Sequence, residues 1–519
     1  MNFRNCLAAS SLVVLMHALP ASALSLHDAV NLTVATNPEI GLTAKDRRAS
    51  EHQLRQARGQ YYPQIDVTAE GGPEFTRNDT VLFGTRRQRL DLDQDHLVLI
   101  NPNTTPRYEI IRGRRVRVGT ELGTVRQNAS DELGAFDYGL LLLRRDGRLT
   151  VSQLLFDGFL TDGAVEEQKA RLVSAARRVE DQTQTSALDA VQAYIDVFRH
   201  RQRLAVAQEN IDAHLMTLDL VRKRAELGGG NIADVYQTEA RLATARTVFR
   251  QIEGDLHTSE ATFQRVVGVP ATDLLPAEDI AGKLPPTVDL AVAQAIANSP
   301  RIRLAQADID AAQAVIRQAE APFYPDAHLQ VSAQAGSHVN GDVEQTLSAQ
   351  ALLVLHYNLY RGGIDAARVR EAKERRNEAI ERLEIQQRIV AEELRISWAL
   401  LQSQKNRVMT LTEQTTANQN TRNVYLQQFD IGQRSLLDLL DATNELFLAR
   451  EGLIDAQATA KFAAYRVLSA EGALVQTLGI PLPPEAIPTE VDYGWAGEVE
   501  TGRNATPVDL NTGKPSLKP

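Results

Sequence analysis

An internal duplication constrains this fold more than any other feature of the sequence. Residues 29–40 recur as residues 291–302, and the step Tyr62-Pro63 recurs as Tyr324-Pro325, both at an offset of 262. Further along, Phe156-Asp157-Gly158 matches Tyr360-Arg361-Gly362 at an offset of 204. The two offsets differ by 58, so the first copy carries an insertion of that length. Because internal repeats reflect repeated structural units, the sequence predicts one architecture built twice.

The repeats set the expected domain boundaries. Residues 24–268 form repeat 1, which holds the insertion at about residues 76–148, and residues 289–478 form repeat 2. The linker at residues 269–288 contains four prolines, as a boundary should. Residues 479–519 form a tail containing proline and glycine, and the lack of periodicity at its end predicts disorder there.

Residues 1–23 have the pattern of a secretory signal peptide. Arg4 supplies the positive region, an apolar run follows, and Ala21-Ser22-Ala23 is a small-residue cleavage site. Removing this segment removes Cys6, the one cysteine of the sequence, so the exported chain is expected to have no disulfide. No later segment has the long apolar run of a transmembrane helix, which leaves periplasmic, secreted and outer-membrane barrel proteins as candidate classes. A net charge of −10 argues against a nucleic-acid partner.

Segments of strict alternation predict β-strands. Residues 326–335 place apolar side chains on one face and polar ones on the other, and residues 347–357 repeat the pattern. In the first copy, residues 65–70 alternate likewise, and Leu149 and Val151 begin the partner strand. Alternating segments of about ten residues are typical of tilted membrane strands, with a small soluble hairpin domain as the alternative. Aromatic residues cluster where these strands meet helices, which predicts an interfacial girdle made by Tyr61, Tyr62, Phe156, Phe323, Tyr324 and Tyr360.

Two segments without glycine or proline predict helices of unusual length. They cover residues 164–227 and 364–431, so each helix reaches roughly 90–100 Å at about 1.5 Å per residue. Ala, Leu and Val dominate their apolar positions, and Arg, Glu and Gln fill the remaining positions. This composition suits coiled-coil packing with one hydrated face. After a glycine break in each copy, residues 232–267 and 436–470 are expected to return as antiparallel helices.

The expected strand count predicts an oligomer. Each chain supplies about four membrane strands, whereas the smallest stable membrane barrels need about eight, and open strand edges cannot face lipid. Two copies give about eight strands around a filled interior, and three give about twelve around a passage. The strand count alone permits both assemblies.

These features together resemble the TolC family of outer-membrane exit ducts, over about residues 24–478. The resemblance rests on the duplication, on the two aromatic-x-Gly steps, and on residues 431–442, which look like the family's tip motif of a Gly-x-Arg turn followed by Asp-x-x-Asp. It implies an α+β membrane protein, in which long antiparallel coiled-coil helices form a periplasmic α-barrel tunnel. Four β-strands per chain then contribute to a trimeric 12-stranded outer-membrane β-barrel.

The resemblance assigns a gate to two carboxylates. Asp438 and Asp441 are three residues apart, so both project from one helix face. Threefold symmetry then implies a ring of carboxylates that narrows the pore and attracts cations. The alternative interpretation is a solvated helix N-terminus, where the helix dipole favours acidic residues in any case.

The resemblance also assigns a latch to the tip. Arg434 matches the position that helps to hold the closed tip together, with Asp234 as its candidate partner, and Gly228 and Gly432 mark the matching turns. Phe429 stands where the family's pattern has a tyrosine, so the latch hydrogen bond of that hydroxyl is missing here. We therefore expect the closed tip to be held by fewer polar contacts than in a family member with that tyrosine.

The insertion carries many arginines among acidic patches and contains an acidic run at residues 91–95. This run hints at a calcium loop, but His96 replaces the turn glycine and Pro102 occupies the position that normally supplies a glutamate ligand. An external surface loop, or extra strand length above the membrane, is the favoured interpretation.

The sequence lacks the phosphate-binding, metalloprotease and nucleophile-elbow motifs of common enzymes, so we expect no catalytic residue, no cofactor and no metal site. The resemblance implies an outer-membrane channel that receives substrate from an inner-membrane transporter, of the ABC or another type, through a periplasmic adaptor. Secreted protein, exported by type I secretion, is the favoured substrate, and small-molecule efflux is the alternative. A periplasmic coiled-coil scaffold is a more distant alternative.

Overall fold

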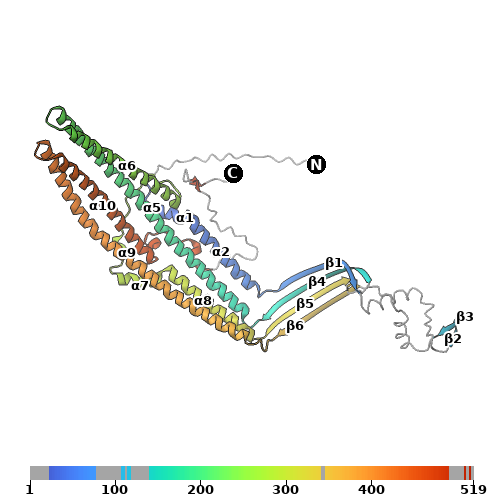
Figure 1. The fold of residues 1–519 in the computed structure, drawn as a ribbon. Helices are drawn as coiled ribbons and strands as arrows, with labels where there is room; N and C mark the ends of the chain where they lie inside the picture. Colours follow the sequence, from blue (N-terminus) through green and yellow to red (C-terminus); the bar gives the residue numbers. More distant parts are fainter. Residues whose placement is uncertain are drawn as a thin grey trace, which may run out of the picture. The chain divides into compact units, whose positions relative to one another are not determined.

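The computed structural model describes residues 23–76, 107–111, 114–118, 140–339, 345–489, 508–509 and 514–515 (Figure 1). The expected signal peptide, most of the insertion with its calcium-like run, and most of the tail lie outside the described residues. The chain divides into two compact units. We call them the helical unit, within residues 1–55, 163–316 and 368–519, and the strand unit, within residues 56–162 and 317–367.

The order of the elements is the same in both halves of the chain, apart from the additional strands β2 and β3 in the first half. The first half contains α1 (Leu26–Thr36), α2 (Pro38–Gly59), β1 (Gln64–Thr76), β2 (Arg107–Ile111), β3 (Arg114–Val118), β4 (Leu140–Phe156), α5 (Leu160–Glu226) and α6 (Ile232–Val267). The second half contains α7 (Val288–Asn298), α8 (Pro300–Glu320), β5 (Asp326–Ser337), β6 (Gln345–His356), α9 (Ile364–Asp430) and α10 (Leu436–Ala470). A short α11 (Leu474–Thr477) and a pair β7 (Val508–Asp509) and β8 (Lys514–Pro515) follow.

The strand unit is built on one antiparallel sheet in the order β1-β4-β5-β6. Its register keeps the alternation of the four strands largely in phase. Asp66, Thr150, Ser332 and Gln350 lie opposite one another, and Val67, Leu149, Ala333 and Ala349 occupy the next row. The sheet therefore has one polar and one apolar face. Leu352 and Val354 of β6 depart from the pattern, because they lie opposite Gln330 and His328. The apolar face carries Ile65, Val67, Leu149, Val151, Leu329, Val331, Leu347, Ala351, Leu353 and Leu355.

The first two strands of this sheet extend into the predicted insertion. β1 continues to Thr76 and β4 already begins at Leu140, and the residues from Thr68 to Thr76 pair with those from Arg148 to Leu140. Residues 140–148 are thus strand and not loop, which matches the extra strand length that we considered for this region. The two added segments stabilise each other because each satisfies the backbone hydrogen-bonding groups of the other.

The helical unit contains two long helical hairpins, α5 with α6 and α9 with α10 (Figure 1). α5 and α9 have 67 residues each, and their returning partners have 36 and 35. Small and aliphatic side chains from both hairpins form a shared cluster near the turns, which includes Leu218, Val235, Leu242, Leu436 and Leu440. No helix among the described residues is long and apolar enough to cross a membrane.

The largest core cluster of the helical unit joins the first helix, both hairpins and the linker between the repeats. Tyr194 and Tyr465 are fully buried at its centre, and the Tyr194 hydroxyl lies 2.8 Å from the Leu24 carbonyl and 2.6 Å from the Leu275 carbonyl. The Tyr465 hydroxyl donates to the Glu278 carbonyl at 3.1 Å. Buried hydroxyls need such partners, so these two tyrosines fix the linker against the helices.

Candidate functional site

Two glycine turns place the candidate tip residues at the ends of the long helices. Gly228 follows α5 and Gly432 follows α9, and each has a φ angle of 78°. This left-handed conformation is costly for residues with a Cβ, which explains glycine at the matching positions of the two repeats. Asn231 and Ser435 then cap the returning helices, because their side-chain oxygens accept backbone N–H groups of the first turn.

The two predicted gate carboxylates lie near the start of α10, and each has an arginine beside it. Asp438 Oδ2 is 3.5 Å from Arg434 Nε, and Asp441 Oδ1 is 3.4 Å from Nη2 of Arg241 on α6. The Asp438 and Asp441 side chains are 45% and 54% exposed, so both remain accessible to solvent and ions. The neighbouring guanidinium groups cancel part of the negative charge that a carboxylate ring would present. The ring itself stays a prediction.

Arg434 is held by its own hairpin in this protomer. Its guanidinium carbon lies 3.9 Å from the centroid of the Tyr425 ring, a cation–π distance, and its ion pair is with Asp438. Among the described residues Arg434 makes no ion pair with Asp234, its predicted partner, which lies in the first turn of α6. The stacking partner could not be predicted from the sequence, because Tyr425 lies nine residues before Arg434, on α9, whereas Arg434 lies in the turn that follows. A latch formed by Arg434 stays a prediction.

Phe429 is a core residue of the tip. Its side chain is 5% exposed in the cluster shared by the two hairpins. Arg224 of α5 places its guanidinium 5.5 Å from the Phe429 ring centroid and donates from Nη1 to the Phe429 carbonyl at 3.3 Å. Arg224 therefore connects the first hairpin to the turn of the second. Nothing in the sequence distinguished Arg224 from the other arginines of α5.

The predicted girdle residues lie in the strand unit, at the ends of the strands. Phe159 stacks edge-to-face with Phe156 at 5.3 Å and with Tyr324 at 5.6 Å between ring centroids. The Tyr61 hydroxyl donates to Asp162 at the start of α5. The remaining predicted girdle residues Tyr62, Phe323 and Tyr360 are exposed in the protomer. Contact of these rings with a membrane interface stays a prediction.

Gly158 allows the close packing beneath this aromatic cluster. It has a φ angle of 67°, and a Cβ atom there would lie 2.5 Å from the Ala321 carbonyl oxygen and 2.8 Å from Tyr324 Cβ. Both contacts are too short for any real side chain, so only glycine fits. The aromatic-x-Gly step of the first repeat is thus a packing requirement as well as a turn.

A charged network covers the polar face near the loop ends of β1 and β4. Arg144 lies within 3.0 Å of Glu70, 3.6 Å of Glu74 and 3.3 Å of Asp146. Gln334 extends the network, since its amide donates to Asp146 at 2.9 Å. Sequence reasoning did not identify these charges, because the pairing partners of β1 lie in a segment that we assigned to the insertion. Their density shows that this face suits water and ions and not lipid.

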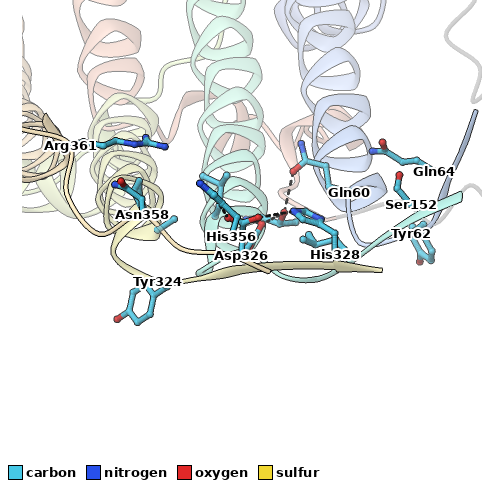
Figure 2. Close-up of a pocket in the computed structure, with 16 residues that line it drawn as sticks. Gln60, Tyr62, Gln64, Ser152, Tyr324, Asp326, His328, His356, Asn358 and Arg361 are labelled. Carbon is cyan, nitrogen blue, oxygen red and sulfur yellow. Dashed lines mark hydrogen bonds and ion pairs between the residues drawn. The ribbon is translucent and has the colours of Figure 1, made fainter. Parts of the chain in front are cut away.

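A pocket of about 540 Å³ lies at the opposite end of the polar face, where the strands meet the helices. Figure 2 shows its polar lining, which includes Gln60, Gln64, Ser152, Asp326, His328 and His356. No group of three or more histidine, cysteine, aspartate or glutamate side chains in the described part of the chain has the geometry of a metal site. The arrangement offers hydrogen bonding and charge to a solvated passage.

Comparison with known proteins agrees with this geometry. The family model described as outer membrane efflux protein matches residues 144–269 and 291–478. The chain is 28% identical to the outer membrane efflux protein BepC of Brucella suis over 354 residues, covering 67% of this chain and 77% of BepC. It is 25% identical to the outer membrane protein TolC of Salmonella enteritidis, covering 69% of this chain and 78% of that protein.

A solved structure shows the same fold. The open state of the Neisseria gonorrhoeae MtrE outer membrane channel aligns with a TM-score of 0.66 at 16% identity, covering 86% of this chain and 89% of that one. The two stretches matched by the family model take in β4, both long hairpins and the second-repeat strands, the elements on which the candidate sites stand. The chain therefore belongs to the outer membrane efflux protein family and lies in the outer membrane of the Gram-negative envelope.

Proposed function

We propose that three copies of this chain form the exit channel of a tripartite transport system and that the protein is not an enzyme. Substrate enters from an inner-membrane transporter and a periplasmic adaptor, and it leaves through the barrel. The long helical hairpins form the periplasmic passage, and the four-stranded sheets of three protomers close the passage through the membrane.

The two-faced sheet with unpaired edges carries this proposal. Among the described residues β1 pairs only with β4 and β6 pairs only with β5, so the outer edges of β1 and β6 have no partner in the protomer. Lipid offers no hydrogen bonds to such edges, and the apolar face with Ile65, Val67 and Leu353 is exposed in the protomer and needs an apolar environment. Three sheets joined edge to edge satisfy both requirements, with apolar side chains toward lipid and charged ones toward a passage.

We assign the gate to the tip of the second hairpin. Asp438 and Asp441, in three copies, narrow the passage and attract cations. Their pairing with Arg434 and Arg241 makes this ring less negative than six isolated carboxylates would be. Movement of α10 away from α6 would separate Asp441 from Arg241 and leave the carboxylate without that positive neighbour, so opening and cation attraction are coupled.

The favoured substrate remains a secreted protein, on the resemblance of the sequence to the type I secretion branch. Small-molecule efflux is the second candidate, and it draws support from BepC, which is named as an efflux protein. Deletion of the gene separates the two candidates. Loss of one secreted protein from the culture medium supports type I secretion, whereas increased sensitivity to toxic small molecules supports efflux.

Planar-bilayer recording tests the channel and its gate together. The wild-type protein, purified in detergent, is compared with the double variant Asp438→Ala/Asp441→Ala. The control is Asp289→Ala, which removes an exposed carboxylate from the first turn of α7. We expect discrete cation-selective channels whose selectivity and conductance change in the double variant and not in the control.

Other outcomes of this recording distinguish the channel function from the assignment of its gate. If selectivity and conductance are unchanged by the double substitution, the protein is a channel but Asp438 and Asp441 do not form its gate. A wild-type protein that stays soluble without detergent and forms no channel would support the coiled-coil scaffold instead.

A further inference from the structure

Two histidines share one carboxylate at the helix end of the polar face. His356 lies directly opposite Asp326 in the pairing of β6 with β5, and His328 is two residues along from Asp326 on the same face. His328 Nε2 is 3.2 Å from Asp326 Oδ2, and His356 Nδ1 is 3.5 Å from Asp326 Oδ1 (Figure 2). We call Asp326, His328 and His356 the histidine cluster. The sequence did not predict this cluster, because its members come from two strands.

The cluster is open to solvent in the wall of the 540 Å³ pocket. The His328 and His356 side chains are 43% and 57% exposed, and that of Asp326 is 38% exposed. Water and protons therefore reach both imidazoles without any rearrangement of the sheet. An imidazole changes its charge between about pH 5 and pH 8, a range in which most other side chains keep theirs.

The other charged groups of the pocket are already engaged. Asp157 accepts hydrogen bonds from the N–H group and the hydroxyl of Thr161 at the start of α5. Arg361 forms an ion pair with Asp365 of α9 at 3.8 Å. The phenols Tyr62 and Tyr324 also line the pocket. Within the lining of the pocket, the histidine cluster holds both imidazoles, the side chains that are suited to change charge near neutral pH.

We propose that His328 and His356 set the charge selectivity of the passage as a function of pH. The inference rests on the proposed function, in which the polar face lines the passage. While both imidazoles are neutral the carboxylate gives the cluster a charge of about −1 per protomer, and protonation of both imidazoles changes this to about +1. Three protomers place three such clusters around one level of the passage, where they attract cations at high pH and anions at low pH.

This level differs from the rest of the polar face. The network around Arg144 is built of carboxylates and a guanidinium group and contains no imidazole. The strand rows between the two ends carry Thr150, Ser332 and Gln350, which do not titrate. His328 and His356 are therefore the histidines of the four described strands of the sheet, and they lie at one level of the polar face.

The test measures the ratio of cation to anion permeability from reversal potentials across a salt gradient. Wild-type channels are recorded from pH 8 to pH 5.5 at about 0.03 M salt, because screening at higher salt hides the charge. A chelator in both chambers removes trace metal ions. We expect the ratio to fall about threefold or more over this range for the wild type.

Three variants locate the effect. The double variant His328→Gln/His356→Gln keeps polar side chains of similar size and should hold the ratio constant with pH. Asp326→Asn should lower the ratio at pH 8, because it removes the negative charge. His338→Gln is the matched control, since His338 lies at the other end of the β5–β6 hairpin and contacts the Leu143 carbonyl, and it should keep the wild-type pH dependence. Migration of each variant as the wild-type oligomer on a gel confirms assembly.

Each outcome decides between the claims. A pH-dependent ratio that survives in the double histidine variant overturns the inference, as does a wild-type ratio that does not change with pH, and in both cases the channel itself stands. A wild-type protein that conducts no current refutes the proposed function and the inference with it. Loss of the pH dependence in the double variant alone supports the inference.

Discussion

Replacing Glu471 with glutamine is expected to stabilise the helical unit at neutral and higher pH. Glu471 follows the last turn of α10, is 5% exposed, and burial raises the pKa of its carboxyl from 4.5 to about 7. The C-terminal end of a helix dipole also disfavours a negative charge there. Between about pH 4.5 and pH 7 the folded protein thus holds a neutral carboxyl where the unfolded chain carries a charge, and at higher pH it holds a buried charge.

The sign and size of the effect follow from these two values. A raised pKa in the folded state means that stability is full below about pH 4.5 and decreases as the pH rises toward 7. A difference of about 2.5 units at about 1.4 kcal/mol per unit gives an upper limit of about 3 kcal/mol per protomer at pH 8, and under about 1 kcal/mol at pH 5. Glutamine keeps the shape and the hydrogen-bonding capacity but has no charge, so Glu471→Gln removes this cost.

Hydrogen exchange of the amides at residues 473–480 measures the effect locally. This segment is tied to Gln184, whose side chain donates to the Gly472 carbonyl at 2.8 Å and accepts from the Val475 N–H group at 3.2 Å. After correction for intrinsic rates, exchange in Glu471→Gln should be slower by up to about 100-fold at pH 8 and by only a few-fold at pH 5. Glu381→Gln, which neutralises an exposed glutamate of α9, is the control and should show no such change. Equal exchange of wild type and Glu471→Gln at pH 8 would refute the reasoning.

Three further predictions follow from the tip and the strand unit. Arg241→Gln should raise the cation selectivity of single channels, because it leaves Asp441 without its 3.4 Å partner, and unchanged reversal potentials would count against the pairing. Phe429→Tyr should lower the resting conductance by restoring the latch hydroxyl, although that hydroxyl must find a partner beside a buried ring; unchanged conductance would remove the latch hypothesis. Gly158→Ala should cost several kcal/mol, on the order of 3, because of the contact with the Ala321 carbonyl at a positive φ angle. Its measure is the yield of heat-resistant oligomer in outer-membrane fractions, and a wild-type yield would contradict the packing argument.

The long helices and the strands could be predicted from local pattern, because each pattern reports its own geometry. The absence of glycine and proline over 64 residues or more favours a continuous helix, because these two residues destabilise helix interiors most. The expected starts of α6, α9 and α10 agree with the structure. Strict alternation marked β5 from Asp326 onward for the same reason. The alternation of β1 was clear only as far as Glu70, since Gly71, Gly72 and Pro73 interrupt it, so extra strand length could be considered but its end at Thr76 could not be predicted.

The partners of individual side chains could not be predicted, because they depend on contacts between distant segments. Arg241 meets Asp441 across 200 residues of sequence, and Arg224 meets Phe429 across 205. The resemblance led us to pair Arg434 with Asp234, whereas within the protomer Arg434 lies over Tyr425 on its own hairpin. The histidine cluster could not be predicted without the register of β5 with β6, because alternation within each strand does not specify which residues lie opposite one another.

The central claim is that the free edges of β1 and β6 pair between protomers and close a ring of three, and cysteine cross-linking tests it most directly. The expected mature chain has no cysteine, so introduced cysteines are the only ones present. One cysteine replaces Val67 of β1, and a second is placed in turn at each apolar-face position of β6, namely residues 347, 349, 351, 353 and 355. Disulfides form only where the Cα atoms lie within about 7 Å, so the scan reports the true register. We predict that one or two adjacent positions give, on non-reducing gels, a ladder of monomer, dimer and trimer that stops at the trimer. A ladder that ends at the dimer or continues beyond the trimer, or the absence of cross-links at every position, would contradict the account.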